Sequence, residues 1–483
     1  MLLCVACVLV TWSKTVGSAG WHVLHPQSRD SGGTDSYPSI RYGHSLAVFN
    51  GTLVTTHGYY YDRERTNATW LSDTWALDIA SSPGQPKWER MCDHFPQPEA
   101  HRHYSSGREP PAPCGRFGFA SAVIGDALLL YGGNDGGYSR TNRQDYRPGH
   151  DFDELWRFNL TTRTWRLLRA QPYGGGPGKR YLAAGAAVHG NFIVYGGTVA
   201  GQGDVWSYNV ADNRWTQLAA ELPRRAGGPG RRMAASLTPW AAAAAPAAAA
   251  GGGSTPAGVV LFGGRTERPN GTTIVQRDTW FFDLAERAWR KLLPTATGGA
   301  APSPPARLYH AAMDTTLTLP EPAAAAAAGD TGPIPSAAAA AAGEADQLSP
   351  EVGPSPARTL RLGIVAGGTF TAPALNCARD AWAFTLDCAA RRIAWARLPD
   401  LPAAVYDTRG AAAGAAAILF GGHLCSLERP DGSAPYPYYY VNEVLRLRLD
   451  EQSAVLAALL KGGGGACRSG DGAAGVAATK EEL

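Results

Sequence analysis

Apolar residues come in short runs along most of this chain, with Gly, Asn or Asp between the runs. The stretch from Arg180 to Leu218 shows the pattern most clearly, in four successive runs: Leu182–Val188, Phe192–Tyr195, Val205–Tyr208 and Trp215–Leu218. Short runs that alternate or are rich in β-branched and aromatic residues predict strands, and tight polar turns between them predict antiparallel pairing. This stretch therefore predicts a sheet of four antiparallel strands, which we call a, b, c and d.

The pattern occurs six times along the chain, with the same landmarks in the same order. An arginine precedes strand a, at Arg41, Arg116, Arg180, Arg232, Arg307 and Arg409. Strand b ends in a glycine doublet, at His57-Gly58 (one glycine only), Gly132-Gly133, Gly196-Gly197, Gly263-Gly264, Gly367-Gly368 and Gly421-Gly422. Strand c carries an aromatic residue, replaced by Leu445 in the sixth copy, and strand d starts at Trp88, Trp165, Trp215, Trp289 and Trp395. Repeats of roughly 40–50 residues predict a radial array of units that bury their faces against one another.

The sixth copy lacks a strand d, and one unmatched Trp-x-x-Leu segment, Trp21–Leu24, precedes the first copy. We expect this N-terminal segment to complete the last unit. A ring closed in this way has six blades and no free sheet edge.

The doublet, the aromatic residue of strand c and the tryptophan of strand d together resemble the kelch motif, over residues 21–449. The resemblance implies an all-β fold, a six-bladed kelch-type β-propeller closed by the N-terminal strand, over residues 21–460. Eleven of the fourteen tryptophans lie on strands c and d, so we interpret them as core residues.

The resemblance also raises an enzymatic alternative, because some kelch propellers modify carbohydrates. Arg307-Leu-Tyr309-His310 resembles the Tyr-His pair that helps bind copper in galactose oxidase, and sialic-acid epimerases have a six-bladed ring. The six repeated arginines either line the mouth of such a ring or bind backbone carbonyls between adjacent blades. We assign no catalytic residue and expect no cofactor or metal.

Charge argues against nucleic-acid binding, and targeting features indicate secretion. The 44 Lys and Arg residues nearly balance the 41 Asp and Glu residues, and no basic stripe of the kind that binds nucleic acid is present. Residues 1–20 combine an apolar run with small residues near Ala19 and predict a cleaved secretory signal peptide. No later segment is apolar enough for a transmembrane helix. Four N-glycosylation sequons, all in expected turns or loops, support secretion: Asn50, Asn67, Asn159 and Asn270.

Six cysteines remain after removal of the signal peptide, and an even number in an oxidising compartment predicts disulfides. We expect Cys92–Cys114 within one connector and Cys377–Cys425 between neighbouring blades, with Cys388–Cys467 as a third pair. Zinc binding is the alternative for the first pair, because His94, His101 and His103 lie between its cysteines.

The connections between strands sort onto two ends of the ring. Turns a–b hold two Ala-, Pro- and Gly-rich inserts, at about 241–256 and 318–356, which we expect to be dispensable linkers. The b–c and d–a loops hold Tyr and Arg residues suited to binding a ligand. The candidate ligand-binding residues at this end are Tyr59, Tyr60, Arg63, Tyr138, Arg140, Arg143, Tyr436 and Tyr438.

Residues 461–483 predict a flexible tail ending in Lys480-Glu481-Glu482-Leu483, which resembles an endoplasmic-reticulum retrieval signal. The sequence thus predicts a protein- or glycan-binding module of the secretory pathway, located in the endoplasmic reticulum lumen or outside the cell. A carbohydrate-modifying enzyme on the same scaffold is the alternative.

Overall fold

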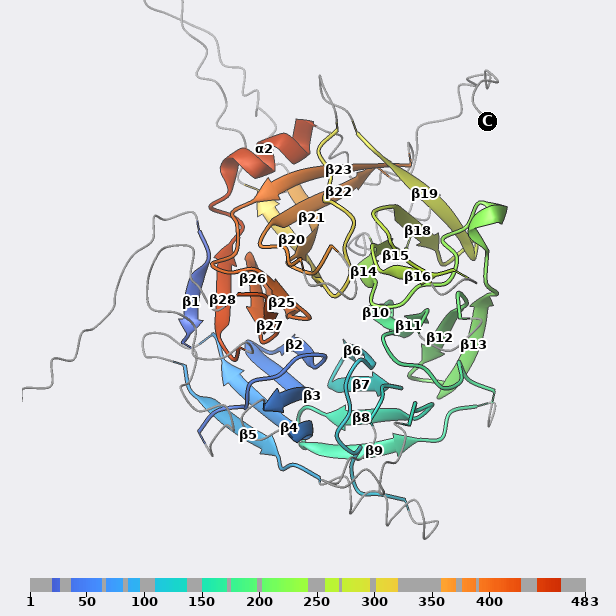
Figure 1. The fold of residues 1–483 in the computed structure, drawn as a ribbon, viewed down its shortest axis with the longest axis vertical. Coiled ribbons are helices and arrows are strands. Elements are labelled where there is room, and N and C mark those ends of the chain that lie inside the picture. The colour runs from blue at the N-terminus through green and yellow to red at the C-terminus, as the bar shows by residue number, and fades with distance from the viewer. Residues whose placement is uncertain are drawn as a thin grey trace, which may run out of the picture.

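The computed structural model describes residues 20–26, 36–62, 67–80, 86–95, 109–136, 150–171, 175–197, 202–241, 257–268, 272–295, 301–319, 358–370, 376–387, 391–426 and 441–461. This part of the chain is almost entirely β-structure, and its sheets are arranged around a common centre (Figure 1). None of its helices is long and apolar enough to cross a membrane.

Six units of four antiparallel strands follow one another around the centre. Unit 1 contains β2 (Ser45–Phe49), β3 (Thr52–Asp62), β4 (Asn67–Asp78) and β5 (Trp88–Cys92). Unit 2 contains β6 (Ala120–Ile124), β7 (Ala127–Tyr131), β8 (Leu155–Asn159) and β9 (Thr164–Leu168). Unit 3 contains β10 (Ala184–Val188), β11 (Asn191–Tyr195), β12 (Val205–Asn209) and β13 (Arg214–Ala219).

The remaining units follow the same order of strands. Unit 4 contains β14 (Ser236–Trp240), β15 (Gly258–Phe262), β18 (Thr279–Asp283) and β19 (Ala288–Pro294). Unit 5 contains β20 (Ala311–Leu319), β21 (Arg358–Ala366), β22 (Ala381–Asp387) and β23 (Arg392–Leu398). Unit 6 contains β25 (Arg409–Ala413), β26 (Ala416–Phe420), β28 (Val444–Arg448) and β1 (His22–His25). The predicted all-β fold of a propeller, built from repeated antiparallel sheets, is confirmed.

The N-terminal strand β1 completes unit 6, as the unmatched Trp-x-x-Leu segment predicts. It pairs antiparallel with β28, with His22 opposite Arg446 and Val23 opposite Leu445, so the first and last strands lie side by side (Figure 1). Trp21, just before β1, is 6% exposed and donates a hydrogen bond from Nε1 to the carbonyl of Pro399 at 3.0 Å. The closing strand is therefore held by both backbone pairing and a buried indole.

Units 4 and 5 are joined in a way that the repeat pattern does not predict. Their outermost strands, β19 and β23, pair in parallel, with Leu293 opposite Arg392 and Pro294 opposite Ile393. The two units therefore form one eight-stranded sheet.

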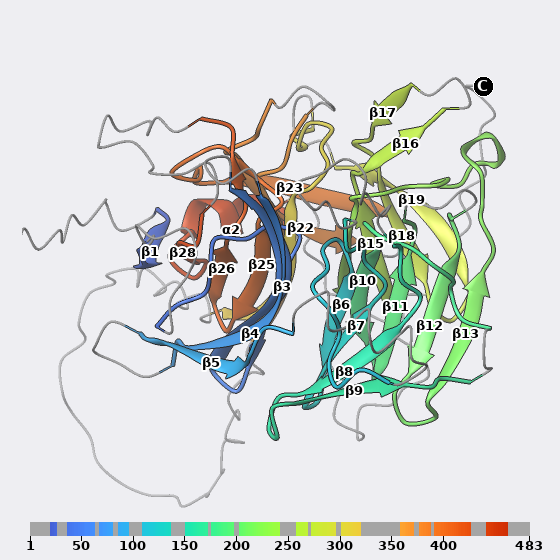
Figure 2. The same ribbon diagram turned by 60° about the horizontal axis from the view of Figure 1, so that its bottom comes forward.

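Several small elements decorate the ring. The two-stranded sheet of β16 (Arg265–Glu267) and β17 (Thr273–Val275) projects at one end of the ring (Figure 2). A second small pair joins β24 (Val405–Tyr406) to β27 (His423–Leu424). A 3-10 turn spans Arg224–Ala226.

The Ala- and Leu-rich segment after β28 forms a helix, α2 (Ser453–Lys461), that the sequence analysis did not predict. It packs against β22 and β23 at the periphery of unit 5 (Figure 1), where Leu456 and Leu459 are buried in the same apolar cluster as Trp21 and Leu398. The helix therefore covers apolar surface near the junction of the two ends of the ring.

Apolar side chains from facing sheets form the core between units. The tryptophans of strands c and d contribute most of its aromatic volume: Trp75, Trp88, Trp156, Trp215, Trp280, Trp382 and Trp395 are all less than 9% exposed. Trp165, Trp206 and Trp289 are half-buried.

The two predicted inserts fall almost wholly outside the described residues, at 242–256 and 320–357. Their flanking strands are paired up to the point where each insert begins, with Trp240 opposite Gly258 and Leu319 opposite Arg358. Both inserts therefore enter the connection between the first two strands of a unit, as predicted.

Candidate functional site

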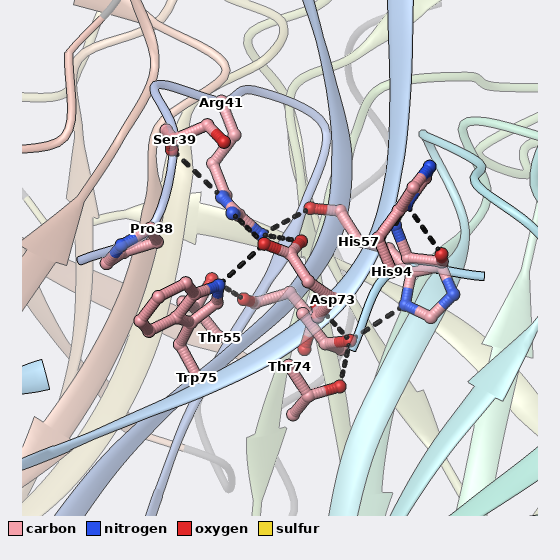
Figure 3. A network of polar contacts seen from close by, with 12 residues as sticks. Pro38, Ser39, Arg41, Thr55, His57, Asp73, Thr74, Trp75 and His94 are labelled. Carbon is pink, nitrogen blue, oxygen red and sulfur yellow. Dashed lines mark hydrogen bonds and ion pairs between the residues drawn. The ribbon is translucent and has the colours of Figure 1, made fainter. Parts of the chain in front are cut away.

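A buried arginine organises each of units 1 to 5, and unit 1 shows the arrangement in detail (Figure 3). Arg41 is fully buried and donates from Nε to the carbonyl of Ser39 and from Nη1 to the carbonyl of His57, both at 3.1 Å. Its two terminal nitrogens each lie 3.0 Å from a carboxylate oxygen of Asp73. Asp73 also accepts a hydrogen bond of 2.6 Å from Trp75 Nε1. One guanidinium thereby connects the segment before β2 to β3 and β4 of the same unit.

Four further units repeat this network of arginine, carboxylate and indole. Its members are Arg116–Glu154–Trp156, Arg180–Asp204–Trp206, Arg232–Asp278–Trp280 and Arg307–Asp380–Trp382. Each arginine also donates to the carbonyl of the first doublet glycine in its own unit. Burial raises the pKa of the Asp380 carboxyl, but the hydrogen bonds and charge of Arg307 outweigh burial and lower that pKa. These charges are fully paired inside the scaffold.

The arginines connect neighbouring units through the backbone rather than through the side chain. The second glycine of each doublet donates its N–H to the carbonyl of the residue at the arginine position of the next unit, over 2.8–3.0 Å. The six pairs are Gly58–Arg116, Gly133–Arg180, Gly197–Arg232, Gly264–Arg307, Gly368–Val405 and Gly422–Arg41. The same carbonyl explains why the first residue of the doublet is also glycine. A Cβ atom on Gly196, the first glycine of its doublet, would lie 2.3 Å from the carbonyl oxygen of Arg232. For Arg41, Arg116, Arg180, Arg232 and Arg307, neither sequence-based interpretation of the side chains is correct, because these side chains bond within their own unit. Arg409 differs, because it lines the central cavity and donates from Nε to the backbone carbonyl of His44 in the neighbouring unit 1.

Unit 6 departs from the pattern at two of the three positions of the network, those of the arginine and the indole. Val405 occupies the place of the arginine, and the strand-c positions hold Glu443 and Leu445. The assignment of Arg409 to the repeated arginine is wrong, because Arg409 is the first residue of the inner strand β25 itself. A cavity of about 20 Å³ is lined by Val405 and Leu445, which are smaller than the arginine and tryptophan of the other units, and by Glu443.

A second series of backbone hydrogen bonds links neighbouring units closer to the centre. The residue two positions after the arginine position adopts a left-handed conformation in every unit: Gly43, Gly118, Leu182, Ala234, Tyr309 and Asp407. The N–H of each donates to the carbonyl of the previous one, from Gly118 to Gly43 through to Asp407 to Tyr309. The backbone of Gly43 in turn donates a hydrogen bond to the side-chain carboxyl of Asp407. This bond joins the first member of the series to the last.

Aromatic residues lie within this series or next to it in five of the six units. We call them the rim, and its members are Tyr42, Tyr59, Phe117, Tyr181, Tyr309 and Tyr406, all half-buried. Tyr59 lies 4.9 Å from Tyr42 and 5.7 Å from Phe117 between ring centroids, and Phe117 lies 6.0 Å from Tyr181. Tyr406 lies 6.2 Å from Tyr309. Rim residues from five units therefore share the end of the ring to which the b–c and d–a loops belong.

A cavity of about 160 Å³ lies at the centre, bounded by residues of all six inner strands. Most of its wall is alanine and glycine. Its polar residues are Ser121, Ser236, Tyr309, His310 and Arg409. Arg409 pairs with Asp407 through Nη1 at 2.6 Å.

The buried histidines serve as packing groups. His310 is 5% exposed, its Nε2 lies 2.8 Å from Ser236 Oγ, and its ring packs edge-on against Phe262. Burial lowers the pKa of His310 to about 3, and the charges of Arg307 and Arg409 act in the same direction. Burial likewise lowers the pKa of His44 and of His57 well below its usual value. Because Ser236 occupies Nε2 of His310, the Tyr309–His310 pair does not present this nitrogen to a metal ion.

The predicted ligand-binding residues divide into two sets. Tyr59 and Tyr60 lie at the end of β3, and Tyr59 is part of the rim. Arg63, Tyr138, Arg140, Arg143, Tyr436 and Tyr438 lie outside the described residues. Sequence analysis missed Tyr42, Phe117, Tyr181 and Tyr406, although the first three directly follow a repeated arginine and this shared position was a usable signal.

The cysteines agree with the sequence analysis in part. Cys377 and Cys425 form a disulfide, which connects the b–c loops of units 5 and 6. Cys92 and Cys114 are both free, so the predicted bond between them is absent. Cys114 is fully buried and lies 3.4 Å from Arg116 Nη2. The alternative zinc ligands His101 and His103, and the third predicted pair Cys388–Cys467, lie outside the described residues.

The sequons also differ from expectation. Asn50 is exposed in the turn between β2 and β3, as predicted. Asn67 and Asn159 are strand residues rather than loop residues, the first of β4 and the last of β8. The side chain of Asn159 donates to Asp126 and accepts hydrogen bonds from the backbone of Thr161 and Thr162. Asn270 lies outside the described residues.

No group of three or more His, Cys, Asp or Glu side chains positioned to hold a metal ion is found within the described ranges.

Comparison with known proteins identifies the repeat. The model of the KLHDC2/KLHL20/DRC7 Kelch-repeats domain matches residues 106–316, which hold units 2 to 4 and the start of unit 5. Among solved structures, the one titled "Structure of YjhT" is 13% identical, with 85% of this chain and 96% of that chain covered and a TM-score of 0.48. The doublets and strand-d tryptophans outside residues 106–316 repeat those inside them. Residues 106–316 therefore form a part of the chain built from kelch repeats.

Proposed function

We propose that this chain is an interaction module of the secretory pathway that binds a protein or glycan ligand through the rim. The observation that carries the proposal is the group of half-buried aromatic side chains around one mouth of the ring. Tyrosine offers a large rigid contact surface with few rotatable bonds and a polar tip, and such side chains dominate binding energy at interfaces. A kelch propeller is a protein-interaction module in general, which agrees with this use.

The position of the loops supports the same face. The loops expected to carry Arg63, Tyr138, Arg140, Arg143, Tyr436 and Tyr438 connect the second and third strands of units 1, 2 and 6. The ends of these strands pair with rim residues: Tyr59 with Tyr42, Asn134 with Phe117, and His423 with Tyr406. A ligand seated on the rim would thus lie near the strand ends from which these loops begin.

Two features support the secretory pathway. The Cys377–Cys425 disulfide is compatible with an oxidising compartment. Asn50 is exposed in a turn, where an oligosaccharide can be attached without displacing buried groups.

Site-specific photocrosslinking tests the rim. A benzophenone amino acid replaces Tyr60 on the rim side, or Leu293, which is 54% exposed on β19, in the full chain expressed in eukaryotic cells. We expect crosslinks to discrete partners from position 60, their loss when Tyr59→Ala is added, and no such crosslinks from position 293. Removal of N-glycans from the partner before irradiation separates a glycan ligand from a protein ligand.

The same cells test the location. Glycosidase treatment should increase the mobility of the wild-type chain on gels, and Asn50→Gln should remove part of that shift. Equal labelling from both positions would reject the rim, and an unglycosylated chain in the cytosol would reject the secretory pathway.

A further inference from the structure

Unit 6 differs from the other units at two positions that line the central cavity in most units. At the first position the other units hold Gly43, Gly118, Leu182, Ala234 and Tyr309, and unit 6 holds Asp407. At the second they hold Ser45, Ala120, Ala184, Ser236 and Ala311, and unit 6 holds Arg409. A charged pair thus stands where five copies of the repeat place uncharged residues, most of them small. The repeat builds the scaffold without this pair.

Arg409 is held at the wall of the cavity by its neighbours. Its Nε donates to the carbonyl of His44 at 2.8 Å, and its Nη1 contacts Asp407 at 2.6 Å and the carbonyl of Thr408 at 3.3 Å. The Asp407 side chain is 3% exposed and the Arg409 side chain is 26% exposed. Among the described residues, Nη2 of Arg409 has no hydrogen-bond partner. A fixed guanidinium with one nitrogen available is a directional donor.

The other polar groups of the cavity are also fixed in place. Ser236 Oγ is paired with His310, and Ser121 Oγ donates to Ser45 Oγ at 3.1 Å. Burial raises the pKa of the Tyr309 phenol to about 12, so this group is protonated at neutral pH and can both donate and accept. The wall of the cavity therefore carries three hydroxyl groups, those of Ser121, Ser236 and Tyr309, each of which can donate and accept hydrogen bonds.

Charge and size limit the ligand. Asp407 already neutralises Arg409, so an anion would bring an uncompensated negative charge into a mostly buried site, which is unfavourable. A neutral hydroxyl or ring oxygen accepts from Nη2 without this cost. The volume of about 160 Å³ is close to the roughly 150 Å³ of an engineered protein cavity that binds benzene, so the cavity limits the ligand to a single ring.

We propose that the central cavity binds one neutral sugar ring, with Arg409 Nη2 donating to a sugar oxygen and the Tyr309 phenol and Ser236 hydroxyl as further partners. This inference rests on the proposed function, because the rim lies at the entrance to the same cavity. It adds that the ligand includes a carbohydrate residue and that the charged pair of unit 6 selects an uncharged one.

Ligand-observed saturation-transfer NMR on the full chain tests the proposal. The probes are D-galactose, D-glucose, D-mannose and, as the anionic counterpart, D-glucuronate. We expect a signal from at least one neutral hexose and a weaker or absent signal from glucuronate. Arg409→Lys keeps the charge that neutralises Asp407 but removes the planar fork, so binding should weaken by roughly tenfold or more.

Two further variants separate binding from folding. Arg361→Lys is the matched control, because Arg361 also pairs with a carboxylate, Asp314, on the inner strands of unit 5 but does not line the cavity. It should leave hexose binding unchanged. Ala312→Leu keeps the charged pair and fills the cavity, so it should abolish hexose binding even if Arg409→Lys does not fold.

Three outcomes would overturn the proposal: no hexose binds, glucuronate binds more tightly than every hexose, or Ala312→Leu leaves hexose binding intact. Rim crosslinks that persist in Ala312→Leu while hexoses fail to bind would reject the sugar site alone and leave the interaction module standing.

Discussion

At the scale of single residues, the repeated arginine contributes two separable interactions. Its guanidinium joins strands within one unit, and its carbonyl accepts a hydrogen bond from the neighbouring unit. Any residue supplies the carbonyl, as Val405 does in unit 6, but only arginine supplies the planar fork. The side chain is therefore needed for the stability of its own sheet, and the backbone for the ring.

The planar fork leads to a prediction for Arg307. Its side chain contacts both oxygens of Asp380, at 3.0 and 2.7 Å, and is fully buried. Arg307→Lys keeps the charge but cannot make all these bonds, so we expect the free energy of unfolding to fall by about 2–4 kcal/mol. Urea titration measures it. The control is Arg397→Lys, in which an exposed pair with Asp400 should change stability by less than about 1 kcal/mol. Equal effects for the two variants would contradict the assigned role.

Buried neutral histidines lead to a prediction for pH. His310 has a pKa of about 3 in the folded chain, below its ordinary value of 6.5. Between these values the unfolded chain binds a proton that the folded chain does not, so stability falls as the pH falls below 6.5. His310 alone should cost about 2 kcal/mol at pH 5.

The measurement is the free energy of unfolding from pH 7 to pH 5. His310→Gln should flatten the slope by close to one proton, whereas His189→Asn, at an exposed turn, should not change it. An unchanged slope in His310→Gln would show that this ring takes up its proton in the folded chain.

At the scale of the elements, each end of the chain contributes to closing the ring. β1 supplies the missing outer strand of unit 6, and α2 covers apolar surface near the same junction. The position of β1 was predictable from the sequence, because the N-terminal Trp-x-x-Leu segment belongs to no unit and the sixth unit lacks a segment of this kind. The second was not, because the helix depends on the contacts of Leu456 and Leu459 with strands far away in the sequence.

Trp21 provides a test of the closure. Its side chain is 6% exposed, so Trp21→Ala should lower the free energy of unfolding by about 3–5 kcal/mol. Loss of β1 pairing would also expose the edge of β28 and favour association, which light scattering detects. Val23→Ala, at a 49% exposed position of the same strand, should cost less than about 1 kcal/mol and remain monodisperse. Similar behaviour of both variants would argue against closure by β1.

At the scale of the whole molecule, the ring is held by hydrogen bonds between units that make no use of the two inserts. Replacing residues 241–257 and 320–357 by Asn-Gly joins positions that are already cross-strand partners, and a two-residue turn of this type suits an antiparallel hairpin. We expect the unfolding midpoint to change little, by less than about 1 kcal/mol in stability.

Thermal unfolding followed by circular dichroism checks this expectation. Deletion of residues 453–461 is the comparison, because it removes the buried Leu456 and Leu459 and should lower the midpoint clearly. A collapse of the midpoint on insert replacement, equal to that of the helix deletion, would mean that the inserts contribute to the core.

The sequence reveals the repeated units because each landmark has a fixed local role: glycine where the backbones of two units meet, tryptophan in the core and acidic residues beside arginine. It reveals the site less well. The rim and the Asp407–Arg409 pair become visible only when the register is known, since Arg409 resembles the repeated arginine in sequence but lies four positions later in the structure. The parallel pairing of β19 with β23 depends on packing between units and has no local signal.

The pairing of β1 with β28 also has a consequence for biosynthesis. About 400 residues separate these strands, and a ribosome adds roughly 5–20 residues per second. The first strand to emerge therefore waits on the order of half a minute or longer for its partner, while units 1 to 5 assemble beside it. Throughout that interval the nascent chain offers two unpaired edges, and it is then that a chaperone would recognise it.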